Sequence, residues 1–353
     1  MKNRKQVRTI SVFPTHTKNK YIPIILECLK NAGYTIVPIE DSSKRIKEID
    51  AFIFNWYETL PENHTFYHFV KRYFRILYLL LKGKEINCTI HNKQPHEGRT
   101  FYSDCLIKLL LKVSSHVFIL CSETMDVLKA YIDEDLIADK VVKLPHPSYT
   151  GAYGCATDAY PEYDGVLRCL YFGHIKPYKN VDLMIQCFID LIKKGYRLEL
   201  SVCGNCPDES FRSYLQKMIS TTDGIKLDIR YVPDEEIIKM VSGYDLFVLP
   251  YSLKSSLNSG AVILAFSYKR TVVSPLIGTL KDLPYERISY CYSYDGSDSD
   301  HLTSLKCAVE KAYLDFQNQH NSLKEKGILA YEVVNSLNSQ EKITEIFKNI
   351  WSI

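Results

Sequence analysis

The run Leu167-Arg168-Cys169-Leu170-Tyr171-Phe172 leads directly into Gly173-His174-Ile175-Lys176-Pro177-Tyr178-Lys179-Asn180. An apolar stretch ends at a glycine, two lysines follow, and a segment with helical periodicity then begins. This order is typical of a strand, loop and helix that receive a phosphate group, because amides at a helix N-terminus and a nearby lysine together stabilise anionic charge. The stretch therefore predicts an α/β unit with an anion site at this loop.

The same alternation of apolar runs and helical segments extends along both halves of the chain, which favours parallel sheets covered by helices on both faces. The predicted strands are Val7–Phe13, Thr35–Pro38, Ala51–Asn55, Ile86–Ile90, His116–Leu120, Val141–Leu144, Leu167–Phe172, Arg197–Cys203, Lys226–Tyr231, Asp245–Leu249 and Thr271–Ser274. The predicted helices are Asn19–Ala32, His64–Gly83, Thr100–Val113, Ser122–Tyr131, Val181–Lys194, Asp208–Ser220, Asp234–Val241 and Ser259–Tyr268.

The length of 353 residues suits two domains. We expect an α/β protein with two Rossmann-like domains that face each other across a cleft. The N-terminal domain would span residues 1–160 and the C-terminal domain residues 161–335, with the Pro/Gly/Tyr-rich stretch Pro145–Gly165 at their junction. Residues 336–353 would form a helix that packs back on the first domain.

Composition excludes several classes of protein. The hydrophobic content of 46% and charged content of 24% are ordinary for a folded protein, and a net charge of +3 is too small to indicate a nucleic-acid partner. No window reaches about 18 consecutive apolar residues, so no membrane-spanning helix is expected. The eleven cysteines show no pairing pattern and no signal peptide precedes them, which predicts reduced thiols in the cytoplasm.

The segment Cys203-Gly204-Asn205-Cys206 resembles a redox or zinc motif, and we reject both interpretations. The first cysteine ends an apolar strand, so we expect it to be buried, and the glycine is explained by a turn between a strand and a helix. No second pair of ligands lies nearby for zinc.

A second candidate phosphate site lies at Tyr251–Ala261, after the predicted strand Asp245–Leu249. Asn258 or Ser259 can cap the helix that follows, and Gly260 allows a phosphate to approach the free amides. An ordinary helix cap explains the same residues. Both candidate loops follow the C-terminal ends of parallel strands, where ligands bind in open α/β sheets.

These segments together resemble a known family. The runs Phe172–Asp182, Tyr231–Glu236 and Gly243–Tyr251, in that order, are similar to glycosyltransferases of the GT-B architecture, nearest to family 4. The similarity covers most of the chain and is strongest from Leu167 to Leu283. It implies transfer of a sugar from a nucleotide-sugar, with retention of anomeric configuration and without a metal ion or other cofactor.

The resemblance assigns roles to individual residues. Lys179 corresponds to the lysine that contacts the donor diphosphate, and His174 or Lys176 stands where the family often has arginine, a residue that a lysine replaces in charge but not in planar geometry. The helix start that cradles phosphate corresponds to Ser259-Gly260-Ala261, and the loop near the nucleoside base to Tyr231-Val232-Pro233. The predicted donor-binding residues are Gly173, His174, Lys176, Lys179, Tyr231, Val232, Pro233, Asn258, Ser259, Gly260 and Ala261.

One departure from the family concerns the sugar contacts. Many members carry two glutamates across this loop and helix, one touching the sugar and the other the ribose. Those positions fall on Ser256 and Leu264 here, and neither side chain accepts hydroxyl hydrogen bonds as a carboxylate does. The identity of the donor therefore stays open between UDP- and GDP-linked sugars.

In the first half, Ile90-His91-Asn92-Lys93-Gln94-Pro95-His96-Glu97 follows a predicted strand and is similar to a run in the family's polysaccharide enzymes. The resemblance places His91 near the donor sugar or acceptor, where it could orient a hydroxyl or act as acid or base. We predict His91 and Lys179 as catalytic and His16, His91, Asn92 and His96 as acceptor-side residues. Loop histidines bonded to the backbone are the alternative, and no metal site is predicted.

The segment Phe66–Lys84 combines aromatic residues at helical spacing with five lysines and arginines, and it has no acidic residue from Asn63 onward. Such a helix can lie on an anionic membrane surface. It can equally be a Rossmann-type helix with one buried face. Both interpretations stay open and are compatible with each other.

We therefore expect a hexosyltransferase-type enzyme of surface-polysaccharide assembly. Its partners would be a nucleotide-sugar donor and a saccharide or lipid-linked saccharide acceptor, with no nucleic acid. It would be cytoplasmic, with peripheral contact to the inner face of the plasma membrane as an open addition. The alternatives are a catalytically weak nucleotide- or saccharide-binding protein of the same fold, supported by the missing glutamates, and a sugar-nucleotide epimerase.

Overall fold

The computed structural model describes residues 7–17, 19–61, 63–93 and 99–351. The chain divides into two compact units: unit 1 is Met1–Pro147 with Asn338–Ile353, and unit 2 is Ser148–Leu337. Each unit contains a six-stranded sheet in which every pair of neighbouring strands is parallel. The predicted α/β class with two parallel sheets is confirmed. The assignment of acceptor and donor binding to separate domains stays a prediction.

The sheet of unit 1 has the strand order β2-β1-β3-β4-β5-β6. Its central strand β3 is buried at every position, as expected for a parallel sheet covered on both faces. The elements are β1 (Thr9–Phe13), α1 (Tyr21–Asn31), β2 (Thr35–Ile36), η1 (Ile39–Asp41), β3 (Ala51–Asn55), α2 (Thr65–Leu81), β4 (Glu85–Ile90), α3 (Phe101–Val113), β5 (His116–Ile119), α4 (Thr124–Leu128), η2 (Glu134–Leu136), η3 (Ala138–Lys140), β6 (Val141–Lys143) and α13 (Gln340–Trp351).

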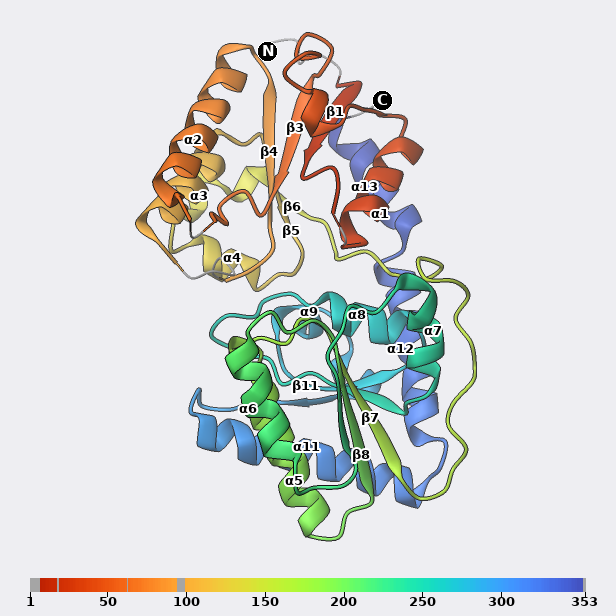
Figure 1. Ribbon diagram of the computed structural model, residues 1–353. Helices are drawn as coiled ribbons and strands as arrows, with labels where there is room; N and C mark the ends of the chain where they lie inside the picture. The colour runs from red at the N-terminus through yellow and green to blue at the C-terminus, as the bar shows by residue number, and fades with distance from the viewer. Residues whose placement is uncertain (1–6, 18, 62, 94–98, 352–353) are drawn as a thin grey trace. The chain divides into compact units, whose positions relative to one another are not determined.

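Helices cover the two faces of this sheet. Helices α2 and α3 pack side by side on one face, and α1 packs with α13 on the other (Figure 1). Three contacts hold α13 there: the Tyr34 hydroxyl donates to the Phe347 carbonyl at 3.1 Å, the Trp351 indole donates to Glu85 at 2.7 Å, and the Cys28 thiol lies 3.5 Å from the Gln340 carbonyl. The last helix of the chain is therefore part of unit 1.

The sheet of unit 2 has the order β12-β11-β10-β7-β8-β9. Helices α5, α6 and α11 pack together, whereas α8 packs with α12 (Figure 1). The elements are β7 (Leu167–Phe172), η4 (Pro177–Lys179), α5 (Val181–Lys193), β8 (Leu198–Cys203), α6 (Glu209–Ile219), β9 (Ile225–Asp228), α7 (Asp234–Ser242), β10 (Leu246–Val248), α8 (Gly260–Ser267), β11 (Thr271–Pro275), α9 (Gly278–Lys281), α10 (Tyr285–Ile288), β12 (Tyr290–Tyr292), α11 (Asp298–Asn318) and α12 (Ser322–Leu337).

The strand order of unit 2 contains a topological switch point. The chain runs outward from β7 to β8 and β9, then returns to place β10 on the other side of β7. The loops that leave β7 and β10 at their carboxyl ends therefore turn to opposite sides of the sheet. In such folds ligands bind at this point.

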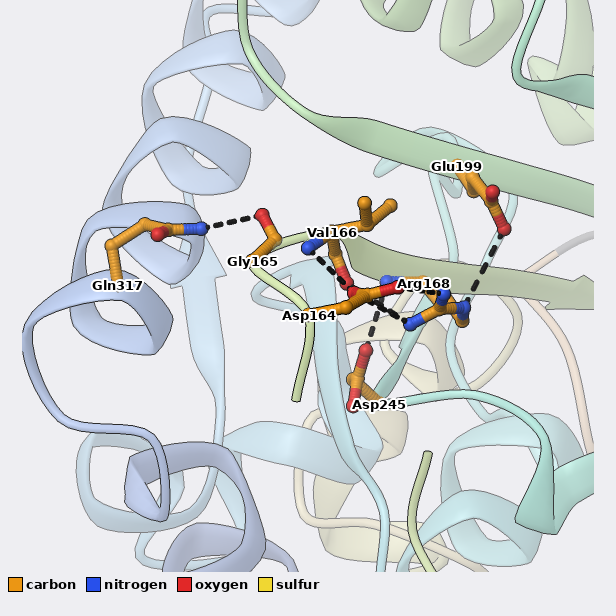
Figure 2. A network of polar contacts seen from close by, with 7 residues as sticks. All are labelled: Asp164, Gly165, Val166, Arg168, Glu199, Asp245 and Gln317. Atoms are coloured by element: carbon orange, nitrogen blue, oxygen red, sulfur yellow. Dashed lines mark hydrogen bonds and ion pairs between the residues drawn. The ribbon is translucent and has the colours of Figure 1, made fainter. Parts of the chain in front are cut away.

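The opposite, amino-terminal end of the same strands is closed by a polar network around Arg168 (Figure 2). The Arg168 guanidinium bonds Asp164 at 2.6 Å and lies 3.6 Å from Glu199. The backbone amide of Arg168 donates to the Asp245 carboxylate at 2.8 Å. Gln317, on α11, donates to the Gly165 carbonyl at 2.8 Å. The network joins β7, β8, the start of β10 and α11.

One predicted strand ends three residues early, and one observed strand was not predicted. The strand predicted at Lys226–Tyr231 ends at Asp228, because Arg230 turns back to bond Asp228 at 2.9 Å and Glu236 at 2.6 Å. The short strand β12 was not predicted. It is three residues long, too short for a period-2 pattern, and it exists because it pairs with β11.

Candidate functional site

The two predicted phosphate loops meet at the switch point of unit 2. The first leaves β7 at Gly173 and leads to α5, and the second leaves β10 and leads to α8. Asn180, the N-cap residue of α5, donates its side-chain amide to the Pro250 carbonyl at 3.0 Å. This hydrogen bond ties the start of the second loop to the end of the first.

Backbone hydrogen bonds join the loop after β7 to the loop after β8. The Gly173 amide donates to the Cys203 carbonyl at 3.1 Å, and the Ile175 amide to the Asn205 carbonyl at 2.9 Å. Gly204 makes this approach possible: its φ is +148°, and a Cβ added there would lie 1.8 Å from the Gly173 carbonyl oxygen. Gly204 therefore allows the loop after β8 to pack closely against the loop of the candidate site.

The two thiols of that segment lack the environment of a reactive pair. Cys203 and Cys206 are both buried. Desolvation raises the pKa of Cys203 to about 12 and also raises the pKa of Cys206. Thiolates are scarce under these conditions, which supports the rejection of the redox interpretation.

The Lys179 amine lies against aromatic rings. It lies over the rings of Tyr251 and Tyr178, 4.6 Å and 5.4 Å from their centroids. Among the described residues, no carboxylate forms an ion pair with Lys179 or Lys176. Desolvation, with a smaller repulsion from Lys176, lowers the pKa of Lys179 to about 8. A nearby anion would relieve both effects.

The start of helix α8 has the predicted capping geometry. The Ser259 hydroxyl accepts a hydrogen bond from the Val262 amide at 3.2 Å. The Ser259 amide donates to the Thr279 hydroxyl, which in turn donates to Asn258. The first amides of a helix have no acceptor within it, and those of α8 belong to Gly260 and Ala261, which are both partly exposed. This geometry fits both an ordinary helix cap and a helix start that binds an anion.

Tyr251 connects Lys179 to this helix start, although it is not among the predicted donor-binding residues. Its ring lies under the Lys179 amine, and its phenol oxygen accepts a hydrogen bond from the Ser259 hydroxyl at 2.8 Å. Tyr251 is only 4% exposed, and burial raises its pKa to about 12. The signal in the sequence was its place directly after Pro250, at the end of a strand.

The histidine of the same loop is more open than Lys179. His174 is exposed, and its carbonyl accepts a hydrogen bond from the Tyr171 hydroxyl at 2.8 Å. Desolvation, followed by repulsion from Lys176 and Lys179, lowers the pKa of His174. The loop therefore gathers two lysines and a histidine whose positive charges oppose one another.

The predicted base-binding loop, Tyr231–Pro233, lies between β9 and α7. The Tyr231 side chain is 54% exposed, whereas Val232 is buried and Pro233 is the N-cap residue of α7. The ion pairs of Arg230 with Asp228 and Glu236 hold the residue before this loop. An exposed aromatic ring at the carboxyl side of β9 is compatible with stacking on a base.

The two positions that usually carry glutamates are both buried. Ser256 is 8% exposed, and its amide donates to the Ser252 carbonyl at 2.9 Å. Leu264 is 4% exposed and lies within α8. Leu264 has no polar atom in its side chain, so it cannot replace a carboxylate that holds a ribose hydroxyl.

In unit 1, the predicted residue His91 follows β4 and is enclosed by aromatic rings. It is 5% exposed, its ring stacks on Trp56 with centroids 4.0 Å apart, and the edge of Tyr21 approaches at 5.0 Å. His91 Nε2 lies 3.0 Å from the Asn55 side-chain oxygen. The carboxyl ends of β3 and β4 therefore fix the orientation of this histidine.

The other predicted acceptor-side residues differ in their surroundings. The His16 side chain is 79% exposed and lies 4.0 Å from Glu40. Asn92, next to His91, is partly buried, and His96 lies outside the described residues. The structure adds instead Asn55, Trp56 and His146, whose ring lies 5.2 Å from that of Tyr21. Desolvation lowers the pKa of His146 to about 4, with the Pro147 carbonyl opposing that shift.

Comparisons with known proteins support the fold and a distant relationship. No protein-family model matches the chain. A GDP-mannose:glycolipid 4-beta-D-mannosyltransferase from Xanthomonas campestris pv. campestris is 28% identical over 202 residues, which are 57% of this chain and 52% of the relative. The chain therefore spans about half the length of the curated relatives it matches.

Solved structures match over nearly the whole chain. Sucrose-phosphate synthase from Thermosynechococcus elongatus has a TM-score of 0.72 at 12% identity, with 98% of both chains covered. Anabaena HepE, solved in complex with UDP-glucose, has a TM-score of 0.70 at 9% identity, with 98% of this chain and 100% of HepE covered. The chain thus has the GT-B fold, and its predicted resemblance to GT-B glycosyltransferases of the family 4 type is confirmed.

Proposed function

We propose that the protein is a glycosyltransferase that moves a sugar from a nucleotide-sugar to a saccharide or lipid-linked saccharide acceptor. Unit 2 would bind the donor through the loops after β7 and β10. Unit 1 would bind the acceptor beside His91. No helix among residues 7–17, 19–61, 63–93 and 99–351 is long and apolar enough to cross a membrane.

The observation that carries this proposal is the state of Lys179. A desolvated cation costs folding free energy unless an anion accompanies it. Lys179 has aromatic partners and, within the part of the chain that the structure describes, no carboxylate as an ion-pair partner. Tyr251 joins it to the start of α8. A cation and the first amides of a helix, both carried by loops at a topological switch point, are groups that suit the phosphates of a nucleotide, and this supports the proposal.

The same groups would act in the reaction. When the bond between sugar and diphosphate breaks, negative charge grows on the leaving diphosphate. Lys179, helped by Lys176 or His174, and the amides of Gly260 and Ala261 would stabilise that charge. On the acceptor side, His91 would orient a hydroxyl, with its ring held in place by Asn55 and Trp56.

The relatives suggest the chemical classes of the substrates. The Xanthomonas relative is named for GDP-mannose and a glycolipid, and HepE was solved with UDP-glucose. We propose a GDP- or UDP-linked hexose as donor and a lipid-linked saccharide as acceptor, in the assembly of a surface polysaccharide.

The anomeric configuration of the product is a separate question. The resemblance to family 4 predicts retention, whereas the printed name of the Xanthomonas relative specifies a β-D-mannosyl linkage. A β-linked product made from an α-linked donor would mean inversion. The one-bond carbon–proton coupling of the product's anomeric carbon, measured by NMR, distinguishes the two outcomes.

The central test measures nucleotide binding and sugar transfer together. Calorimetric titration with GDP, UDP and the corresponding nucleosides would be combined with transfer assays on a panel of GDP- and UDP-sugars. We expect Lys179→Ala to weaken diphosphate binding by about tenfold or more while nucleoside binding is unchanged. Lys217→Ala, an exposed lysine on α6 of the same unit, is the matched control. If no nucleoside diphosphate binds, or if both variants bind it equally, the proposal fails.

A binding protein without transferase activity is the second candidate. It is favoured by the buried Ser256 and Leu264 at the positions of the usual glutamates. Such a protein would bind a nucleoside diphosphate with dependence on Lys179 but would transfer no sugar from any donor of the panel. Detection of a glycosylated product excludes this candidate.

A further inference from the structure

Helix α2 is apolar on two sides. Ile76 and Leu79 are buried, and Phe69, Tyr73 and Leu80 pack against the same hydrophobic core of unit 1. This buried side agrees with the interpretation of α2 as an ordinary Rossmann-type helix. A helix of that kind normally presents polar side chains to solvent on its other side.

The outer side of α2 instead presents large apolar side chains. Tyr67, Lys71, Phe74, Tyr78 and Leu81 follow one another at alternating spacings of four and three residues, which places them along one stripe. The exposed fractions of the four apolar members are 62% for Tyr67, 62% for Phe74, 46% for Tyr78 and 86% for Leu81. Only Lys71 interrupts the stripe.

The stripe continues onto the start of α3. Phe66 and Phe101 are 61% and 75% exposed, and both rings contact Tyr102, at 5.7 Å and 5.8 Å between centroids. Of the twelve large apolar side chains exposed among the described residues, six belong to this surface. Single exposed apolar residues are normal, but a concentration of this kind marks a contact surface. We call the exposed side chains of Phe66, Tyr67, Lys71, Phe74, Tyr78, Leu81, Lys82 and Phe101 the outer α2 surface.

The charge of the outer α2 surface is entirely positive. Helix α2 contains no acidic residue, and Lys71 and Lys82 are exposed on it. On the neighbouring α3, Lys108 and Lys112 are exposed, while Asp104 is paired with Arg99 at 2.8 Å. The two arginines of α2 point to the protein instead: Arg72 bonds the Thr59 carbonyl at 2.7 Å, and Arg75 bonds Ser42 at 2.9 Å.

We propose that the outer α2 surface docks on an anionic lipid bilayer. Aromatic and aliphatic side chains would enter the boundary between headgroups and acyl chains, and Lys71 and Lys82 would meet the negative headgroups. A second copy of the chain fits less well, because the eight described residues of this surface would bring lysines and no carboxylate to the contact from each copy. This docking stands apart from the proposed transfer reaction, since it depends on neither donor nor acceptor.

The test is co-sedimentation of the full chain with sucrose-loaded vesicles. One set of vesicles contains phosphatidylcholine alone, and the other contains phosphatidylglycerol mixed with phosphatidylcholine. We expect binding to the anionic set only, weakened as NaCl is raised from about 0.1 M to about 0.5 M because the Debye length shortens. The double variant Lys71→Glu, Lys82→Glu should bind about tenfold or more weakly. The double variant Phe74→Ser, Leu81→Ser should lose a similar factor through lost apolar burial.

The matched controls lie on helix α11 of unit 2, where Lys311 and Leu314 are exposed one turn apart. Lys311→Glu and Leu314→Ser should leave vesicle binding unchanged. Thermal unfolding followed by circular dichroism shows whether each variant is folded, and the salt and lipid dependence of the wild type needs no variant. The proposal is overturned if the wild type does not bind anionic vesicles, or if the α2 and α11 variants bind equally. A dimer would also overturn it. The evidence would be a dimer in light scattering that the double variant Phe74→Ser, Leu81→Ser dissociates, together with no binding to vesicles.

Discussion

The two ends of the unit 2 sheet use similar residues in opposite ways. At the amino-terminal end, Arg168 is bonded to Asp164 and lies beside Glu199, and its amide is held by Asp245 (Figure 2). At the carboxyl end, Lys179 lies over two aromatic rings, and no carboxylate among the described residues pairs with it. One cation is matched within the protein, and for the other we propose a bound diphosphate as the counter-ion.

The pKa values follow this difference. The hydrogen bonds from Arg168 hold the pKa of the exposed Asp164 at about 2. Burial raises the pKa of Asp245 to about 6, although the Arg168 amide and guanidinium oppose that shift. At the other end, desolvation and the smaller repulsion from Lys176 both lower the pKa of Lys179, which falls to about 8. A group left uncompensated in a folded protein indicates a functional site more strongly than a paired one.

The comparison predicts its largest effect at Lys179. Lys179→Met keeps an apolar chain over Tyr251 but removes the charge, so we expect kcat/KM for sugar transfer to fall by about 100- to 1,000-fold. The free energy of unfolding should stay the same or rise, because a desolvated cation without a counter-ion is removed. Steady-state kinetics and urea unfolding measure the two quantities. A large loss of stability together with normal kinetics would reverse the assignment of the two ends.

The next effect concerns Arg168 and should fall on stability alone. Arg168→Met leaves Asp164 and Glu199 without this partner. It also removes a positive charge that favours the ionised form of the buried Asp245. We expect the free energy of unfolding to fall by about 1–3 kcal/mol. The kcat/KM for transfer and the affinity for nucleoside diphosphate should be unchanged. A kinetic defect at a temperature where the variant is fully folded would contradict this prediction.

The third effect is a pH dependence that belongs to the carboxyl end. Below a pH of about 8 Lys179 is charged, and a bound diphosphate would raise its pKa further. The affinity for GDP or UDP should therefore be level below that pH and fall by up to about tenfold per pH unit above it. Titrations across the pH range measure this profile. Lys179→Arg, which stays protonated, should bind with a flat profile, and a wild-type profile without a bend would refute the prediction.

The same pKa has the opposite consequence for stability. The pKa of Lys179 is about 8 in the folded protein against an ordinary value of 10.5, so the unfolded chain holds the proton more tightly. Between a pH of about 8 and about 10.5, the unfolded chain binds more protons at this lysine than the folded protein does. Without ligand, the free energy of unfolding contributed by Lys179 should therefore rise with pH over this range. Ligand binding and unliganded stability should thus move in opposite directions over this range, a pattern that Lys179→Met should abolish.

The sequence predicted the parts of this site that depend on local order. Gly173 and Lys179 follow an apolar run, and Ser259-Gly260 precedes an apolar helix, so a single pass along the chain finds the strand, loop and helix at each place. The parallel sheets followed from the alternation of such units. The unpredicted β12 is a strand only because β11 offers it an edge, which is a tertiary effect.

Contacts between distant residues could not be predicted in this way. Nothing in the sequence joins Asn55 and Trp56 to His91, because they meet only where β3 and β4 end side by side. The reason for Gly204 is also invisible without the Gly173 carbonyl that lies against it. The two apolar sides of α2 need the structure as well, since helical spacing alone does not say which aromatic residues are covered.

Substitutions of Tyr251 should cause the smallest loss of affinity, and they separate the role of its ring from that of its phenol oxygen. Tyr251→Phe keeps the ring under the Lys179 amine and removes the phenol oxygen that accepts from Ser259. We expect the affinity for nucleoside diphosphate to fall by about three- to tenfold, which is the range for one lost hydrogen bond. Tyr251→Leu removes the ring as well, so it should lose more and should also move the bend of the pH profile, because the cation then loses its aromatic partner. Equal losses in the two variants would mean that the ring does not hold Lys179. A loss in Tyr251→Leu alone would mean that the bond to Ser259 does not matter, so that the two halves of the phosphate site act independently.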